Sequence, residues 1–210
     1  MFVRFSRRYH RYFSSMSACR VLVPVATGSE DIEVTAITDT LRRADIDVVL
    51  ASLEPAKNVT LSRGVTIIPD VNGLGTLVNS NFDAIVLPGG LVGAKLLSGD
   101  THLLQMLRKN DGLTAAICAS PALVLAQHGL LNGKTNITCY PTFANMMPVA
   151  ISIDSVAVDG NLITSRGPAT AILFSLQIVA ALRGFSVAEK VGEGMLIETE
   201  ELVKIKDRMR

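Results

Sequence analysis

The sequence predicts a single α/β domain in which helices cover both faces of a mostly parallel central sheet. Short apolar runs alternate with amphipathic segments from Val21 onward. The runs are continuously apolar, which is typical of parallel strands that are buried on both faces. The chain has 210 residues and contains no internal repeat, low-complexity block or linker, so one domain of ordinary size accounts for it.

The apolar runs predict strands over residues 21–25, 48–51, 65–68, 83–87 and 113–117, and shorter strands near 135–140, 151–158 and 161–164. The segments between them predict helices over residues 30–44, 91–97, 101–109, 121–127 and 168–182. In the first helix, Ile32, Ile37 and Leu41 share one apolar side. Residues 198–210 are charged and mixed, which predicts a charged C-terminal tail with a solvated helix end.

Composition excludes several classes of protein. The formal net charge is +1, so bulk charge gives no reason to expect a nucleic acid or an anionic membrane as partner. No apolar run approaches the length of a membrane-spanning helix. The three cysteines, Cys19, Cys118 and Cys139, match neither a disulfide framework nor a zinc-binding pattern. We therefore expect a protein of a reducing compartment that has no metal site.

Residues 1–19 differ from the rest of the chain. They carry four arginines between Arg4 and Arg11 among aromatic, apolar and serine residues, and no acidic residue occurs before Glu30. Wound as a helix, the segment has a basic side and an aromatic-apolar side, as in a mitochondrial transit peptide. The alternative is a basic tail without a targeting role. We expect a mitochondrial protein, or otherwise a cytoplasmic one, whose domain spans residues 20–197.

The most informative stretch runs from Ala115 to Pro121. An apolar run breaks at Cys118, and a helical pattern begins at Pro121, a residue type that is favoured in the first turn of a helix. Cys118 is therefore predicted on a tight strand-to-helix turn, a cysteine nucleophile elbow beside the free N–H groups of a helix. That environment favours a lowered pKa and a nucleophilic sulfur. The alternative is a cysteine that is only packed in the core.

Two further segments follow predicted strands and therefore reach the same edge of the sheet as Cys118. Glu33 lies in the segment after the first strand, where burial raises the pKa of a carboxyl and suits it to act as acid and base. The alternative is an acidic residue that only complements the helix dipole.

Gly89 and Gly90 follow the strand that ends at Leu87, and glycine allows close approach of the backbone. Their N–H groups, together with that of Ala119, are candidates to stabilise an oxyanion. The alternative is that these glycines only form an ordinary turn.

The histidines do not support a Cys–His–carboxylate triad. His10 lies in the leader, His102 begins a predicted surface helix, and His128 lies roughly two or three helical turns from Cys118. A peptidase or amidohydrolase is therefore not favoured.

The motifs resemble those of the ThiJ/PfpI superfamily and, within it, the branch of the parkinsonism-associated deglycase (DJ-one). The similarity covers residues 20 to about 191 and rests on five motifs in order, at residues 28–33, 41–44, 87–90, 115–121 and 164–168. It implies a flavodoxin-like α/β sandwich, a homodimer and a cofactor-free enzyme.

The resemblance also implies roles for individual residues. The reactive cysteine and its glutamate partner match Cys118 and Glu33, and the oxyanion-side backbone matches Gly89, Gly90 and Ala119. Arg63 matches a segment that reaches toward the partner's active site in the family's homodimer, and Arg166 and Pro168 match a loop that borders the pocket. Tyr140 stands where animal members carry a histidine, and a tyrosine does not exchange protons readily near neutral pH.

The function implied by the resemblance is that of a glyoxalase and deglycase. Cys118 adds to the aldehyde of methylglyoxal or glyoxal to form a hemithioacetal, Glu33 moves the proton between adjacent carbons, and hydrolysis releases lactate or glycolate. Glycated protein is attacked in the same way. The alternative is a redox sensor or holdase chaperone that acts through oxidation of Cys118.

Overall fold

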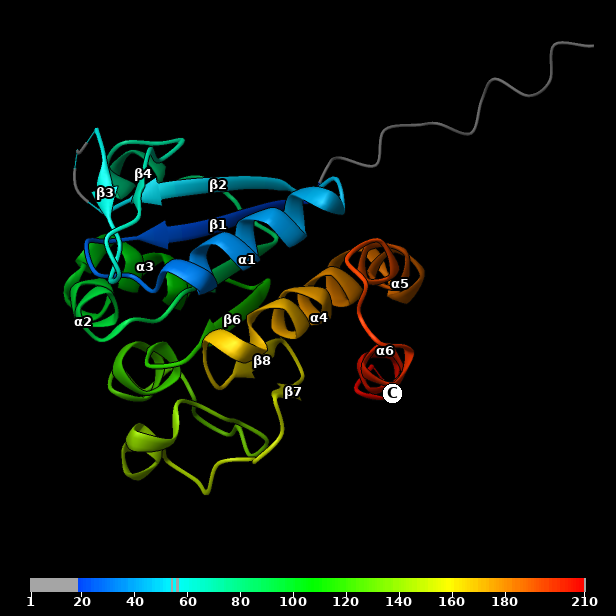
Figure 1. Cartoon of the computed structure of the whole chain (residues 1–210). Coiled ribbons are helices and arrows are strands. Elements are labelled where there is room, and N and C mark those ends of the chain that lie inside the picture. The colour runs from blue at the N-terminus through cyan, green and yellow to red at the C-terminus, as the bar shows by residue number, and fades with distance from the viewer. Residues whose placement is uncertain (1–18, 54, 56, 210) are drawn as a thin grey trace, which may run out of the picture.

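A central sheet is the frame of the molecule. The computed structural model describes residues 19–53, 55 and 57–209, and these residues form a six-stranded sheet in the order β2-β1-β5-β6-β8-β7 (Figure 1). Its strands are β1 (Arg20–Val25), β2 (Asp47–Ser52), β5 (Ala84–Leu87), β6 (Leu113–Ile117), β7 (Val156–Asp159) and β8 (Leu162–Ser165). Neighbouring strands are parallel except β7, which runs antiparallel to β8. The predicted flavodoxin-like α/β fold with a mostly parallel sheet is confirmed.

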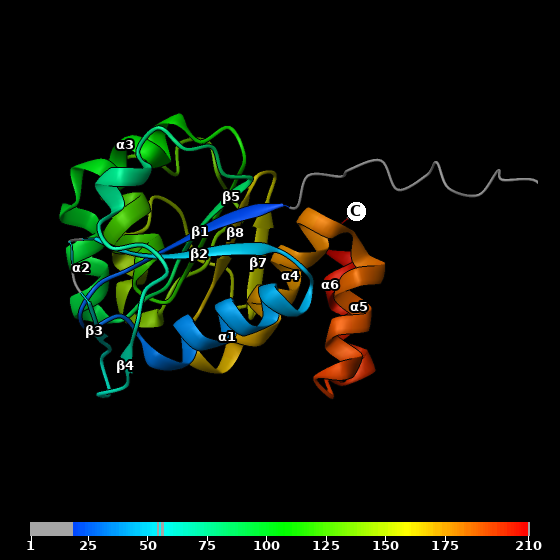
Figure 2. The same cartoon turned by 90° about the horizontal axis from the view of Figure 1, so that it is seen from above.

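Helices cover both faces of this sheet, as Figure 2 shows from above. One face carries α1 (Asp31–Arg43), α4 (Ala171–Arg183), α5 (Phe185–Gly194) and α6 (Thr199–Asp207). The other carries the short helix η1 (Leu74–Leu77), α2 (Leu91–Gly99), α3 (Thr101–Lys109) and η2 (Pro121–Ala126). Two further short helices, η3 (Pro141–Met146) and η4 (Pro168–Thr170), lie in connecting loops.

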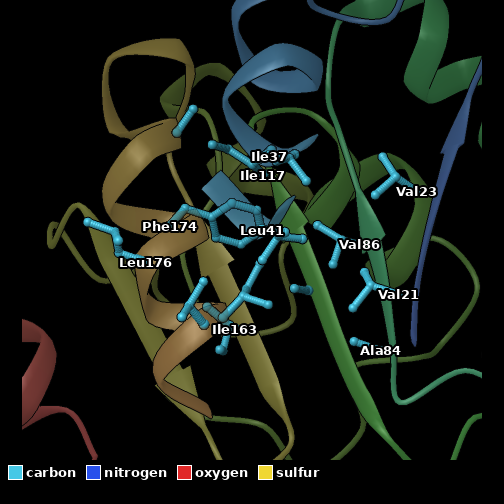
Figure 3. Close-up of a cluster of buried hydrophobic side chains, with 14 of the residues drawn as sticks. Val21, Val23, Ile37, Leu41, Ala84, Val86, Ile117, Ile163, Phe174 and Leu176 are labelled. Carbon is cyan, nitrogen blue, oxygen red and sulfur yellow. The ribbon is translucent and has the colours of Figure 1, made fainter. Parts of the chain in front are cut away.

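The strand side chains alternate between two hydrophobic cores. In β1, Val21 and Val23 pack in the core under α1 and α4, whereas Leu22 packs in the core on the opposite face. Figure 3 shows the first core, where Ile37 of α1 and Phe174 of α4 lie among the strand side chains. Because both faces are buried, the strands are apolar at every position, and this made them recognisable in the sequence.

The start of α1 determines where Glu33 lies. The Glu30 side chain caps the helix by accepting a hydrogen bond from the Glu33 N–H group at 2.7 Å. This cap satisfies one of the free N–H groups of the first turn, and acidic residues are favourable there. Since α1 begins a few residues after β1, its first turn lies at the carboxyl edge of the sheet.

Residues 65–68 contain a strand, as predicted, but it lies outside the main sheet. β4 (Thr66–Ile67) pairs antiparallel with β3 (Val59–Thr60) to form a two-stranded sheet. The turn between them is held by Asp31, whose carboxylate accepts a hydrogen bond from the Arg63 N–H group at 2.7 Å.

The prediction of a strand near residues 135–140 is wrong, because the segment forms no strand. The Thr135 N–H group donates to the Asp159 carboxylate at 2.8 Å, and the Thr138 N–H group donates to the Thr164 hydroxyl at 2.9 Å. Side chains, rather than the backbone of a neighbouring strand, satisfy these donors, so the segment stays irregular although part of it is buried.

Two other predicted elements differ in extent. Of the strand predicted near 151–158, only β7 from Val156 onward forms, after a loop in which Ile153 is 85% exposed. The helix predicted from Pro168 begins as the tight turn η4 and becomes α4 at Ala171.

The C-terminal region is more ordered than the sequence indicates. α5 was not predicted, and the predicted tail over 198–210 contains α6. Leu202 and Ile205 of α6 are buried in the core shared with α4. Charged residues surround this apolar pair in the sequence, which is why the segment resembles a solvated helix end.

Residues 1–18 of the predicted transit peptide lie outside the described residues. Cys19 is described, and its thiol donates to the Leu182 carbonyl at 3.6 Å, while its own carbonyl accepts from the Asp47 N–H group at 2.9 Å. The packed fold thus includes Cys19. None of the helices in the described part of the chain is both long and apolar enough to span a membrane.

We expect Ile205→Ala to lower the free energy of unfolding by about 2–5 kcal/mol, because it leaves a cavity at a fully buried position of α6. Val203→Ala is the matched control, since it removes a β-branched side chain from the same helix at a position that is 48% exposed. The control should change stability by no more than about 0.5 kcal/mol. Urea unfolding measures both, and equal effects would show that α6 is not packed on the domain.

Candidate active site

Three segments meet at the carboxyl edge of the sheet. Cys118 follows β6, Gly89 follows β5, and Glu33 lies in the first turn of α1 after β1. A Cβ atom placed on Gly89 would lie 2.5 Å from the Cys118 Cβ and 2.8 Å from the Glu33 Oε2. The structure therefore brings together the cysteine, the glutamate and the glycine turn that the sequence places at this edge.

Cys118 lies on a strained backbone turn. Its φ angle is 64°, in the left-handed region that residues other than glycine rarely adopt. Two hydrogen bonds hold this conformation: the Cys118 N–H group donates to the Ser165 carbonyl at 3.0 Å, and the Cys118 carbonyl accepts from the Tyr140 N–H group at 2.8 Å. The tight strand-to-helix elbow predicted from the sequence is thus present, and strain at such a turn is typical of functional sites.

The helix after the elbow is wider than a regular α-helix. The Gln127 N–H group donates to the Ala122 carbonyl and the Leu130 N–H group to the Leu125 carbonyl, five residues back in each case. These bonds make η2 a π-type helix, a form that often occurs at functional sites.

Glu33 is fully buried beside the cysteine. Its Oε2 accepts a hydrogen bond from the Gly89 N–H group at 2.7 Å. Its side chain interacts with that of Cys118, but Oε1 has no hydrogen-bond partner of good geometry among the described residues. Burial raises the pKa of Glu33 to about 7, although the Gly89 bond favours the charged form. Near neutral pH this carboxyl is therefore able both to accept and to donate a proton.

The Cys118 thiol does not have the lowered pKa expected from the sequence. Burial and the negative charge of Glu33 raise its pKa to about 12. The N–H groups of Gly90 and Ala119 interact with the sulfur and lower the pKa, as expected for a helix terminus, but they are outweighed. The prediction from the sequence is wrong because it weighed the helix terminus without the opposing burial and charge.

The two groups titrate as a pair because each acts on the other. The pKa of Cys118 is raised further than that of Glu33, so the carboxyl loses its proton before the thiol does. The pair then carries one negative charge, which Glu33 releases to the sulfur when it takes the thiol proton.

Gly90 directs the second peptide group of the turn toward the sulfur. The Gly89 carbonyl accepts a hydrogen bond from the Glu30 N–H group at 3.1 Å, so the Gly90 N–H group points the opposite way, to Cys118. Gly90 has a φ of 85°, and a Cβ atom there would lie 2.3 Å from the Gly28 carbonyl oxygen. Only glycine fits this position.

The remaining predicted pocket residues occupy two different places. Tyr140 contacts the elbow through its N–H group, which donates to the Cys118 carbonyl. Its side chain is 41% exposed and packs against Gly167, where a Cβ atom would lie 3.3 Å from the ring. Arg166 donates to the Ile153 carbonyl at 2.6 Å, and Pro168 begins η4 in the same loop.

Arg63 is exposed in the turn between β3 and β4. No hydrogen bond or ion pair among the described residues joins its side chain to Cys118 or Glu33. The described part of the chain also contains no group of three or more His, Cys, Asp or Glu side chains arranged to hold a metal ion.

One residue of the site was missed in the sequence. Ser120 is fully buried, and its hydroxyl donates to the Pro88 carbonyl at 2.5 Å. A serine before a helical proline suggests a helix cap, yet this side chain caps nothing. Its partner lies in another loop, and spacing in the sequence gives no signal for such a contact.

Comparison with known proteins identifies the family. Residues 19–181 match the model of the DJ-1/PfpI family. The chain belongs to this family. The resemblance inferred from the motifs is thereby confirmed.

Individual DJ-1 relatives are similar over most of the chain. DJ-1 homolog B of Arabidopsis thaliana is 42% identical over 182 residues, which are 85% of this chain and 41% of that protein, so the chain spans less than half of its length. The glutathione-independent glyoxalase DJR-1.2 of Caenorhabditis elegans is 35% identical over 81% of this chain and 91% of that protein. The structure of oxidized Toxoplasma gondii DJ-1 matches with a TM-score of 0.82 and 40% identity, covering 86% of this chain and 99% of that chain.

We expect the rate of Cys118 alkylation by iodoacetamide to rise with a midpoint well above the ordinary thiol pKa of about 8.5, because burial and the charge of Glu33 raise the pKa of the thiol. In Glu33→Gln the midpoint should move downward, because the neutral amide removes the neighbouring negative charge while burial remains. Mass spectrometry of the modified peptide separates Cys118 from Cys19 and Cys139. The same midpoint in both proteins would mean that the charge of Glu33 does not act on the thiol.

Proposed function

We propose that this protein is a cofactor-independent glyoxalase that converts methylglyoxal to lactate and glyoxal to glycolate. The observation that carries the proposal is the buried Glu33 carboxyl, which lies against Cys118 and titrates near pH 7. A base that titrates near the working pH is the kind that catalyses proton transfer efficiently. The name of the C. elegans relative, a glutathione-independent glyoxalase, supports the same reaction.

In the first step, the Cys118 sulfur forms a bond to the aldehyde carbon while the Glu33 carboxylate takes the thiol proton. The carbonyl electron pair moves to oxygen, where the N–H groups of Gly90 and Ala119 stabilise the developing charge. Protonated Glu33 then returns its proton to this oxygen. The product is a neutral hemithioacetal, and Glu33 is again a carboxylate.

In the second step, Glu33 removes the remaining hydrogen of the former aldehyde carbon as a proton, and the ketone oxygen takes up the hydroxyl proton of the hemithioacetal, so that an enediolate forms. Glu33 then returns its proton to the former ketone carbon, and the oxygen on the first carbon becomes the thioester carbonyl. The first carbon is oxidised and the second is reduced, so no external oxidant or reductant is needed. The result is a thioester of lactate on Cys118. Water cleaves the thioester, releases lactate and restores the thiol.

Early glycation adducts on protein or amino acids are a second substrate class for the same nucleophile. At the aldehyde-derived carbon of such an adduct, a bond to the Cys118 sulfur forms and the bond to nitrogen breaks, and the amine leaves with the thiol proton. Only 8% of Cys118 is exposed, which favours small dicarbonyls over large substrates.

We also propose a homodimer in which Arg63 of one subunit approaches the site of the other. Exposed apolar side chains lie at the start of α1, on either side of β4 and at the start of α2, namely Ile32, Val65, Ile68, Leu91 and Val92. Apolar clusters of this kind on a surface mark interaction sites. Sedimentation equilibrium tests the assembly, and a monomer at micromolar concentration would contradict it.

A redox sensor or holdase is the second candidate function. The T. gondii relative was solved in an oxidized form, and a cysteine beside a carboxylic acid is suited to stop at the sulfinic stage. Turnover of methylglyoxal by fully reduced protein separates the two functions, because a sensor does not need it.

We expect Cys118→Ala to abolish lactate formation from methylglyoxal, because it removes the sulfur that bonds to the aldehyde carbon. Glu33→Gln should be severely impaired, since an amide does not exchange the proton. Tyr140→Phe should cost little, about the 0.5–1.5 kcal/mol of one hydrogen bond, because Tyr140 contacts the elbow through its backbone. Lactate production by each folded variant decides this order, and a Tyr140→Phe protein as inactive as Cys118→Ala would assign proton transfer to the tyrosine.

The leader is proposed to direct the protein to mitochondria. Residues 1–19 fused to a fluorescent reporter should carry it there, and replacing the four arginines between Arg4 and Arg11 by glutamine should abolish import. Microscopy with a mitochondrial marker gives the result. An evenly cytosolic reporter would leave only the interpretation of a basic tail.

A further inference from the structure

A buried hydroxyl connects the two loops that form the candidate active site. Ser120 follows Cys118 by two residues, and its Oγ donates to the Pro88 carbonyl at 2.5 Å. Pro88 immediately precedes the Gly89–Gly90 turn. The hydrogen bond therefore joins the elbow after β6 to the turn after β5, and both of its partners are shielded from water.

The Pro88–Gly89 peptide group is held at both ends. Its carbonyl accepts from Ser120, and its N–H group donates to Glu33 Oε2 at 2.7 Å. A chain of hydrogen bonds thus runs from the Ser120 hydroxyl through one peptide group to the carboxylate. Bonds in such a chain polarise one another, so the donor on the carbonyl strengthens the N–H group as a donor.

Gly89 itself contributes little to holding this peptide group, because it has no side chain and glycine restricts its own backbone less than any other residue. The next peptide group is fixed separately, because the Gly89 carbonyl accepts from the Glu30 N–H group. The orientation of the Pro88–Gly89 group consequently depends on its own two hydrogen bonds, to Ser120 and to Glu33.

We propose that Ser120 is a positioning residue of the active site, whose hydroxyl fixes the peptide group that holds the Glu33 carboxyl against Cys118. This inference rests on the proposed function only in taking Glu33 and Cys118 as the reacting pair. Ser120 acts through the peptide group, because its hydroxyl donates to the Pro88 carbonyl while the Gly89 N–H group donates to the carboxyl.

The consequence is a change in the titration of Glu33. Two titratable groups act on this carboxyl, Glu30 from the same helix and Cys118 from the elbow, together with burial and the Gly89 N–H group. Of these influences, the Gly89 N–H group is the one bonded in series with Ser120. Because that bond stabilises the charged carboxylate, loss of the hydroxyl weakens it and raises the pKa of Glu33.

The test compares Ser120→Ala with Ser175→Ala in the full chain. Ser175 is the matched control, since it is also fully buried and its hydroxyl also donates to a backbone carbonyl, that of Ala171 at 2.7 Å. The Glu33 carboxyl is titrated by carbon NMR with labelled glutamate, its resonance being assigned with Glu33→Gln. We expect Ser120→Ala to move the midpoint upward by about half a unit or more, which corresponds to a weakened hydrogen bond, and Ser175→Ala to leave it unchanged.

Alkylation of Cys118 provides a second readout. Ser120→Ala should shift its pH midpoint upward in the wild-type background and produce no further shift when Glu33→Gln is already present. A merely structural role would lower stability in both serine variants and move neither midpoint. A folded Ser120→Ala protein with wild-type midpoints overturns the proposal.

Two further outcomes are informative. If Ser120→Ala does not fold, Ser120→Cys keeps a weaker donor in the same place, and its NMR midpoint should move in the same direction by less; an unchanged midpoint again overturns the proposal. Lactate formation is measured separately on the wild-type protein. If no lactate forms while the midpoint shifts as expected, the proposed function fails and the positioning role of Ser120 stands.

Discussion

The site depends on a carboxyl group that is buried with a single hydrogen bond from the backbone. Burying a charged carboxylate is costly, and one N–H group, that of Gly89, offsets only part of that cost. The result is a pKa of about 7 for Glu33, so its proton is exchanged readily at physiological pH. The cap at Glu30, the glycine turn and the elbow at Cys118 all have their places because they bring this carboxyl to the sulfur.

The sequence was sufficient to predict the frame and the principal residues. Strands buried on both faces are apolar throughout, and the edge at which parallel strands end is a matter of topology, so Cys118, Glu33 and the glycine turn could be placed together. Residues 135–140 are irregular although their pattern predicts a strand, because side chains accept the hydrogen bonds of the Thr135 and Thr138 N–H groups. The thiol pKa and the Ser120 contact depend on distances between loops, which periodicity does not encode.

The elbow at Cys118 is held by the backbone of Tyr140 and not by its side chain. The contact that supports Cys118 comes from the Tyr140 N–H group, which every residue except proline provides. The ring is half-exposed and packs beside Gly167. Another side chain at this position meets the same backbone requirement, so the nucleophile keeps its conformation whichever side chain stands here.

The proposed leader and the candidate active site lie at opposite ends of β1. Cys19 lies directly before the first residue of β1, and Glu33 lies beyond its last residue. Six extended residues place the two ends of the strand about 20 Å apart. The residues before Cys19 thus join the domain at the end of β1 opposite to the candidate active site. Removal of the proposed leader should therefore leave the geometry around Glu33 unchanged.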